Sequence, residues 1–213
     1  MIIKKDNFEL IIKKIFSKKF NRKKRIIIGI AGPCCSGKST FSSELNTYLL
    51  RNYKNQNSKV VMMDGFHFDN SILRQRKLIS KKGEPITFDS EAFLDLVKKI
   101  KKKHNSHITF PIFDRKLDLS RSSADSMNKS NRVIIIEGNY LLLKKSPWKK
   151  LKQYIDFFVF LKVDKNILKD RIQKRWKYYG LSKNAIQKKV KNDMNLVNIT
   201  SKKSAKADII INN

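Results

Sequence analysis

The sequence feature that most constrains the fold is a short loop between an apolar segment and a helix-forming segment. Residues 25–30 form a β-branched run typical of a buried strand, and apolar residues recur at helical spacing from Phe41 to Leu49. The loop between them fits the pattern G-x-x-x-x-G-K-[ST]. Its residues are Gly32, Pro33, Cys34, Cys35, Ser36, Gly37, Lys38, Ser39 and Thr40. The pattern predicts a strand–loop–helix unit whose backbone N–H groups and helix N-terminus bind the phosphates of a nucleotide.

Two side chains of this loop have separate predicted roles. Lys38 reaches the outer phosphates as a point charge, and the Ser39 hydroxyl is offered to Mg²⁺. The chain has only 7 glycines, and Gly29, Gly32 and Gly37 all fall in or beside the loop. This concentration favours a nucleotide site over a glycine turn beside a lysine-rich helix.

Apolar runs alternate with helical patterns along the rest of the chain. Strands are expected at 25–30, 58–63, 107–113, 132–138 and 156–163, with a late strand at 207–211. Helices are expected after the loop, from about 89 to 100, from the fifth strand to about 179, and over 183–200. This order predicts an α/β fold: a single P-loop NTPase domain over 1–213, with a doubly wound, mostly parallel five-stranded sheet and helices on both faces. Residues 64–90 and 116–131 are expected to be irregular.

The N-terminal 24 residues form a helix and a basic connector in this interpretation. Phe8, Ile11, Ile12, Ile15 and Phe16 share one helical face, and we expect that face to pack on the sheet rather than lie on an anionic membrane. The basic run at 18–25 is expected to be a solvated connector.

The strongly basic composition limits the possible partners. The chain carries 48 Lys and Arg against 18 Asp and Glu, a net charge of +30. A polyanionic partner is one explanation, but the lysines are spread over nearly every segment, which favours compositional drift. We therefore expect no specific nucleic-acid partner. The sequence does not determine the oligomeric state.

Two adjacent cysteines cannot build a disulfide framework, which suits a reducing compartment. No apolar run approaches the ~20 residues needed to span a bilayer. We expect a cytoplasmic protein. Cys34 and Cys35 precede a helix N-terminus, a setting that can lower the pKa of a thiol. The sequence is compatible with two interpretations of these cysteines: reactive thiols, or two small side chains that the loop shields.

Reactive side chains follow several of the predicted strands. Asp64 follows the second strand, Asp114 and Arg115 follow the third, and Glu137 ends the fourth. Ligands bind at the carboxyl ends of strands in an open parallel sheet, so these residues are expected to meet at one site.

With these segments in place, the chain resembles the phosphoribulokinase, uridine kinase and pantothenate kinase family of small-molecule kinases. Within it, the sequence is most similar to the fructose-transport-system-kinase-like, or nucleoside/nucleotide-kinase-like, branch. The matching segments are residues 29–40, 63–70, 82–89, 111–115, 136–142, 173–176 and 192–193. The chain departs from the family at Cys34 and Cys35, where smaller residues or glycine are common.

The resemblance implies an ATP-dependent kinase that phosphorylates a hydroxyl of a small metabolite, with ATP and Mg²⁺ as cofactors. Asp64 resembles the family's catalytic base, beside the phosphate-binding Lys38, and Glu137 holds Mg²⁺ near Ser39. On the substrate side the resemblance places His67, Arg115 and Tyr140. Arg171 and Arg175 resemble the arginines of a helical lid, at about 171–192, that closes on the phosphates.

The acceptor is not identified by the sequence: a sugar, a nucleoside and a pantothenate-like compound all fit. A nucleoside monophosphate kinase is an alternative if Arg74 and Arg76 form a second phosphate site. A regulatory or nucleic-acid-associated NTPase is another. A GTPase is disfavoured because Asn-Lys-x-Asp is absent, and a motor ATPase because the fourth strand ends in Glu-Gly rather than Asp-Glu.

Overall fold

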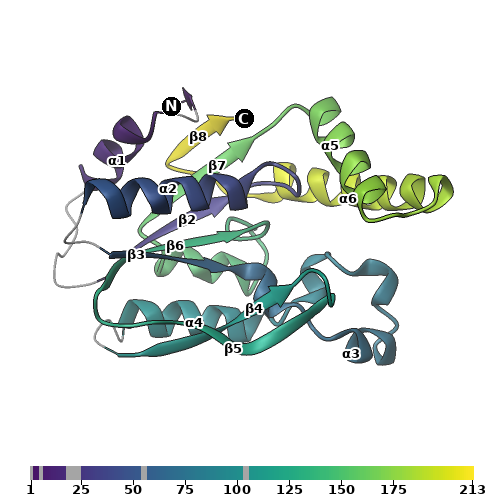
Figure 1. Ribbon diagram of the computed structural model, residues 1–213, viewed down its shortest axis with the longest axis horizontal. Helices are drawn as coiled ribbons and strands as arrows, with labels where there is room; N and C mark the ends of the chain where they lie inside the picture. Colours follow the sequence, from purple (N-terminus) through teal and green to yellow (C-terminus); the bar gives the residue numbers. More distant parts are fainter. Residues whose placement is uncertain (1, 5–6, 18–24, 54–56, 103–105) are drawn as a thin grey trace.

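A parallel sheet forms the centre of the computed structural model, which describes residues 2–4, 7–17, 25–53, 57–102 and 106–213. Within these residues the sheet has six strands in the order β1-β8-β7-β2-β6-β3 (Figure 1). The strands are β1 (Ile2–Lys4), β2 (Ile26–Ala31), β3 (Asn57–Met62), β6 (Asn131–Gly138), β7 (Phe157–Lys162) and β8 (Ile209–Asn212). Strand β2 pairs with β6 and β7, and all of its residues are buried, which explains its continuous apolar run. The phosphate loop therefore leaves the middle of the sheet.

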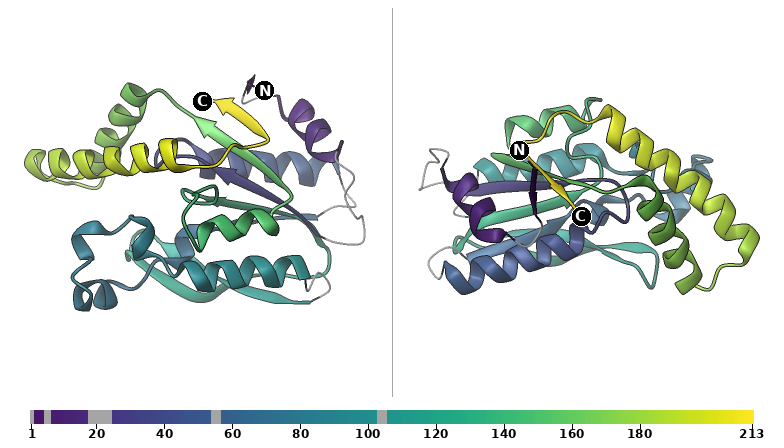
Figure 2. Two further views of the ribbon diagram at one scale, coloured as in Figure 1. Left: turned by 180° about the vertical axis from the view of Figure 1, so that it is seen from behind. Right: turned by 90° about the horizontal axis from the view of Figure 1, so that it is seen from above.

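Helices cover both faces of the sheet (Figures 1 and 2). Helices α1 (Phe8–Phe16) and α2 (Lys38–Asn52) share one core with the sheet, and α4 (Ser90–Lys102) and the 3-10 helix η4 (Trp148–Gln153) share the other. The buried face of α1 consists of Ile11, Ile12 and Ile15, so this helix packs on the domain as expected. The basic run at 18–24 lies outside the described residues.

Helices α5 (Lys165–Tyr178) and α6 (Lys183–Lys203) pack against each other and extend beyond the sheet (Figure 2). A small core of their own contains Leu168, Ile172 and Val197, and both cysteines of the phosphate loop pack against it. Two segments distant in the sequence, the loop and this helical pair, are thereby joined.

The predicted α/β fold class is confirmed, and the structure changes the composition of the sheet. The run at 107–113 is not in the parallel sheet: it forms β4 (Ile108–Asp114), which pairs antiparallel with β5 (Leu119–Met127) in a separate hairpin. The predicted loop at 116–131 is therefore largely a strand. Pro111 in the middle of β4 lacks an N–H, and the register shifts between Phe110 and Ile112, so this run suits a hairpin better than the centre of a sheet.

The segment between β3 and α4 is built from short helical turns. These are η1 (Met63–Phe66), α3 (Asn70–Gln75), η2 (Ile79–Lys81) and η3 (Pro85–Thr87). The N-terminus of α3 is capped by Asp69, whose carboxylate accepts from Ser71 N–H at 2.8 Å. Among the described residues, no helix is long and apolar enough to cross a membrane.

Candidate active site

The phosphate loop curls between β2 and α2 as the sequence predicts. Gly37, with φ +84°, is the N-cap of α2, and Cys35 also has a left-handed φ of 57°. Lys38 Nζ donates to the Pro33 carbonyl at 2.8 Å across the loop. Burial lowers the pKa of Lys38, and the nearby Glu137 carboxylate opposes this effect. A buried ammonium with one carbonyl partner is suited to receive a more highly charged ligand such as a phosphate.

Ser39 and Glu137 meet at the start of α2. Strand β6 pairs with β2 so that Glu137 lies opposite Ile30, two residues before the loop. Ser39 Oγ donates to Glu137 Oε1 at 2.9 Å. Glu137 is only 4% exposed, its Oε2 has no hydrogen-bond partner among the described residues, and burial raises its pKa. A hydroxyl and an unpartnered buried carboxylate oxygen are donors that fit Mg²⁺.

Asp64 projects from η1, directly after β3. Its Oδ2 forms an ion pair with Arg115 Nη2 at 2.8 Å, and Arg115 follows β4 in the hairpin. Gly65 lies against the same hairpin: a Cβ at this position would be 2.4 Å from the Pro111 carbonyl oxygen. The hairpin therefore fixes both the backbone and the carboxylate of Asp64.

His67 lies one turn after Asp64, between the rings of Phe88 and Phe113 at centroid distances of 3.9 and 4.8 Å. Its Nδ1 is 2.8 Å from the backbone oxygen of Asp64, which can only accept, so Nδ1 carries the proton. Burial lowers the pKa of His67. The neutral ring therefore has an acceptor at Nε2.

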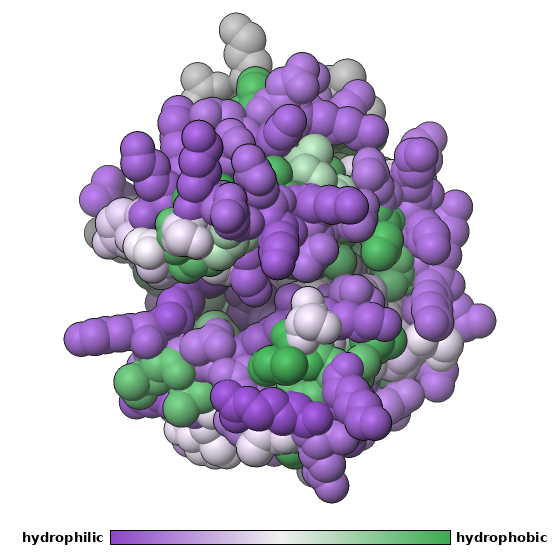
Figure 3. Space-filling view, turned by 90° about the vertical axis from the view of Figure 1, so that its right-hand side faces the viewer, coloured by the Kyte–Doolittle hydropathy of each residue, from purple (hydrophilic) through white to green (hydrophobic). Residues whose placement is uncertain are grey.

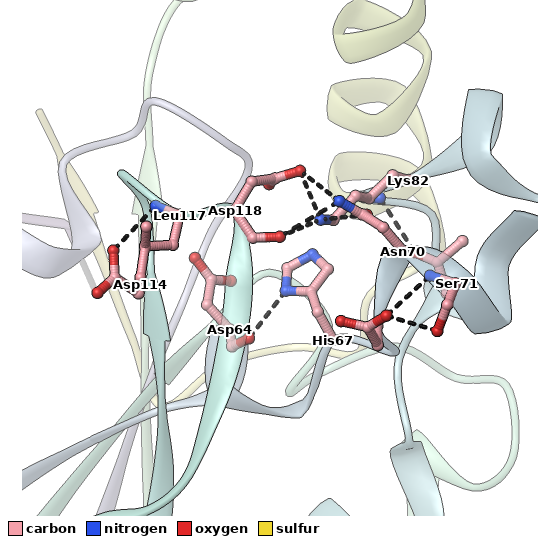
Figure 4. Close-up of polar contacts among 11 residues, drawn as sticks. Asp64, His67, Asn70, Ser71, Lys82, Asp114, Leu117 and Asp118 are labelled. Carbon is pink, nitrogen blue, oxygen red and sulfur yellow. Dashed lines mark hydrogen bonds and ion pairs between the residues drawn. The ribbon is translucent and has the colours of Figure 1, made fainter.

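A cluster of three polar side chains that the sequence did not predict as part of the site lies beyond His67 (Figure 4). Lys82 Nζ bonds Asn70 Oδ1 at 2.8 Å and Asp118 Oδ2 at 2.9 Å, and Asn70 Nδ2 donates to Asp118 at 3.0 Å. This group ties the segment after β3 to the turn of the β4–β5 hairpin. Lys82 lies in a segment of the family resemblance, but Asp118 lies in the region expected to be an irregular loop.

Arginines of α5 contact the loop from the other side. Arg171 Nη1 donates to the Cys35 carbonyl at 3.4 Å, and Arg175 Nη1 is 4.0 Å from Cys35 Sγ. Asp193 of α6 accepts from Trp176 Nε1 at 2.8 Å, and burial raises the pKa of Asp193. The only sequence signal for Asp193 is its position in the last segment of the resemblance.

These groups surround one cavity of about 640 Å³. It lies between the loop, the α5–α6 pair and the hairpin, and hydrophilic side chains dominate this end of the molecule (Figure 3). The predicted site residues that line the cavity are Cys34, Cys35, Gly37, Lys38, Ser39, Thr40, Asp64, His67, Arg115, Glu137 and Arg175. The lining also includes Lys82, Phe88, Phe113, Asp118, Trp176 and Asp193.

Four predicted residues contribute from behind this lining. Gly32, Pro33 and Ser36 are buried in the loop, and Arg171 acts on it through Cys35. The family resemblance predicts that Tyr140 contacts the substrate, but in the structure its ring is fully buried beside Phe88. Its hydroxyl donates to the Gly83 carbonyl at 2.5 Å. Tyr140 supports the cavity wall because Gly83 is part of the lining.

The arginines required by the nucleoside monophosphate kinase alternative are not part of the cavity lining. Arg74 and Arg76 are exposed on and after α3, and Arg76 lies over the Phe68 ring at 4.4 Å. The cavity therefore has one phosphate-binding loop and no second arginine pair from this segment.

Comparison with known proteins agrees with this geometry. The model of the phosphoribulokinase / uridine kinase family matches residues 27–213. A Schizosaccharomyces pombe protein named "Putative uridine kinase C227.14" is 30% identical over 194 residues, which cover 88% of this chain and 83% of that protein. The pantothenate kinase of Streptococcus suis is 29% identical over 71% of this chain, and the match spans about half of the relative (49%).

A solved structure has the same architecture over nearly its whole length. It is the "putative fructose transport system kinase" from Silicibacter sp. TM1040, with a TM-score of 0.89 and 32% identity over 96% of this chain and 98% of that one. The chain belongs to the phosphoribulokinase / uridine kinase family and is an ATP-dependent kinase of small molecules.

Proposed function

We propose that this kinase transfers the γ-phosphate of ATP to a hydroxyl of a small metabolite, with Asp64 as the general base. One observation carries the proposal: the Asp64 carboxylate opens onto the same cavity as Lys38 and Ser39, and Arg115 holds it at 2.8 Å. Phosphoryl transfer needs little covalent chemistry from the protein, so positioning and charge stabilisation are its main contributions.

The phosphates of ATP are bound by the loop N–H groups, the N-terminus of α2 and Lys38. Ser39 and Glu137 hold Mg²⁺, a role supported by the unpartnered Oε2 of Glu137. The bound ion supplies neutralising charge at the transferring phosphoryl group. Arg171 and Arg175 belong to a helical lid, at about 171–192, that closes on the phosphates. Both arginines contact the loop at Cys35, which supports this role.

Asp64 orients the acceptor hydroxyl in line with the phosphoryl group and takes its proton late in a loose transition state. Arg115 keeps the carboxylate turned toward the cavity through its bond to Oδ2. The close contact of Gly65 with the hairpin limits movement of the backbone beneath it. The acceptor hydroxyl is thereby held by a group with little freedom to turn away.

The acceptor binds on the side of the cavity that contains His67. The Nε2 lone pair of His67 accepts from a second hydroxyl or an N–H of the acceptor, and the flanking Phe88 and Phe113 rings exclude water. A sugar, a nucleoside or a pantothenate-like compound meets this requirement, and two of these classes are named in the relatives.

The test is Asp64→Asn, which keeps the shape of the side chain and removes its basicity. General-base catalysis contributes about 10²- to 10⁴-fold, so kcat should fall by that order while the Kd for Mg·ATP stays within about twofold. Asp114→Asn is the matched control, because Asp114 lies at the end of β4 outside the cavity lining. An unchanged kcat would exclude Asp64 as the base, and a joint loss of Mg·ATP binding would make it a metal ligand instead.

A panel of sugars, nucleosides and pantothenate-like compounds, assayed for ADP release, identifies the acceptor class. A true acceptor should raise ADP release at least tenfold over the rate with ATP alone, and Asp64→Asn should remove the increase. If no hydroxyl compound raised ADP release while a nucleoside monophosphate did, the monophosphate kinase alternative would replace the proposal.

A further inference from the structure

The two adjacent cysteines of the phosphate loop lie in different surroundings. Cys34 Sγ is 3.8 Å from the Asp193 carbonyl oxygen of α6. Cys35 Sγ instead lies 4.0 Å from Arg175 Nη1, and Arg171 donates to the Cys35 carbonyl. Both cysteines line the cavity that holds the nucleotide site. One sulfur thus lies beside a carbonyl oxygen and the other beside a guanidinium.

This arrangement separates the acidity of the two thiols. A hydrogen bond from Cys34 and the charge of Arg175 lower the pKa of Cys35 to about 6, against the effect of burial. The same hydrogen bond and burial raise the pKa of Cys34. The N-terminus of α2, which begins at Lys38, adds positive potential at the loop.

We propose that Cys35 is an oxidation site for small hydroperoxides and that its oxidation closes the nucleotide site. The Cys35 thiolate attacks the outer oxygen of the hydroperoxide, the O–O bond breaks, and the alcohol or water leaves after taking a proton from solvent. The sulfur loses two electrons and becomes a sulfenic acid, and the hydroperoxide gains them. A small thiol then converts the sulfenic acid to a mixed disulfide with release of water, and a second thiol restores Cys35.

Cys34 does not complete an internal disulfide with Cys35. Adjacent Cα atoms are about 3.8 Å apart across a trans peptide, which is below the roughly 4.4–6.8 Å range of ordinary disulfides. In the oxidised loop, Cys35 alone is therefore modified.

Oxidation and nucleotide binding compete for the same groups. The Cys35 sulfur lies beside Arg175, which the proposed function assigns to the phosphates, and an added oxygen or thiol occupies part of the cavity. Mg·ATP should protect Cys35 from oxidation. Oxidation of Cys35 should in turn weaken ATP binding.

The experiment treats the full-length protein with hydrogen peroxide, traps sulfenic acid with dimedone, and locates the adduct by fragmentation mass spectrometry. At pH 7 the adduct should form on Cys35 at least tenfold faster than on Cys34, and Mg·ATP should slow it at least fivefold. The proposal is overturned if Cys34 is labelled as fast as Cys35, or if no adduct forms.

Several variants together test whether the loss of activity comes from Cys35, so the test does not depend on the folding of any one of them. The residual activity of Cys35→Ser, normalised to its own untreated sample, should resist peroxide, whereas Cys34→Ser should lose activity and regain it with dithiothreitol. Iodoacetamide labelling of the wild-type chain should have a midpoint near pH 6 at Cys35, and Arg175→Gln should raise that midpoint. A midpoint at the ordinary thiol value of about 8.5 contradicts the proposal. If labelling of Cys35 is fast but Mg·ATP gives no protection, it is the assignment of the loop to ATP that fails.

Discussion

The position of the proposed base depends on a backbone contact that one methyl group would disturb. Gly65 directly follows Asp64, and the hairpin packs against it. A Cβ at residue 65 would lie 2.4 Å from the Pro111 carbonyl oxygen and 2.8 Å from its carbonyl carbon. The carbon–carbon distance is about 0.7 Å short of the ~3.5 Å at which carbon atoms make favourable contact. Both neighbours are backbone atoms, so Gly65→Ala must move η1 or β4.

The expected consequence is a loss of catalysis larger than the loss of stability. Overpacking of this kind costs about 1–3 kcal/mol in folding free energy, and a displacement of about 1 Å at a catalytic group can cost about 10²-fold in rate. We expect kcat of Gly65→Ala to fall between about 30- and 100-fold at a temperature where the variant is folded. The Kd for Mg·ATP should change less than threefold, because the phosphate loop lies between β2 and α2 and not on η1 or the hairpin.

The assay combines urea unfolding, steady-state kinetics and ATP titration on the same preparations. Ser120→Ala is the matched control: it removes the hydrogen bond from Ser120 to the Gly65 carbonyl without adding an atom. It should cost about 1 kcal/mol and less than fivefold in kcat. A Gly65→Ala variant that keeps its kcat while Asp64→Asn loses it would refute the argument that the hairpin positions the base.

Two further predictions use the loop and the acceptor side. Lys38→Ala should reduce turnover below detection and raise the Kd for ATP at least 100-fold without unfolding the chain at 25 °C; circular dichroism and calorimetry test this, and unchanged turnover would contradict the nucleotide assignment. His67 has a lowered pKa in the folded protein, so below about pH 6.5 the unfolded chain binds more protons, and the free energy of unfolding should fall as the pH falls. His67→Gln should remove that part of the decline in urea titrations between pH 7.5 and 5. An identical decline in the variant would show that other groups cause it.

Local patterns in the sequence determined the centre of the fold and half of the site. The loop at 32–40 fixes a strand before it and a helix after it, because its N–H groups bind an anion only in that arrangement. The continuous apolar run of β6 could be assigned because strands buried on both faces are near-continuous runs of apolar residues. Ser39 and Glu137 could be paired because parallel strands bring their carboxyl ends to one edge.

Tertiary structure decided the acceptor side, where partners are distant in the sequence. Strand β5 has a mostly polar sequence in which only Met127 is buried, and its pairing with β4 makes it a strand, so no apolar periodicity predicts it. That hairpin brings Arg115 to Asp64 and Asp118 to Lys82. The burial of Tyr140 likewise depends on the aromatic cluster around Trp148 rather than on its neighbours in the chain.

The contrast between the two cysteines shows the same division most clearly. The sequence places Cys34 and Cys35 side by side before a helix N-terminus and gives both the same electrostatic setting. Only the packing of α5 and α6 on the loop brings Arg175 to one sulfur and a backbone carbonyl to the other. Electrostatic effects on a thiol depend on distances of a few ångströms, and such distances between segments more than 130 residues apart are set by the folded core alone.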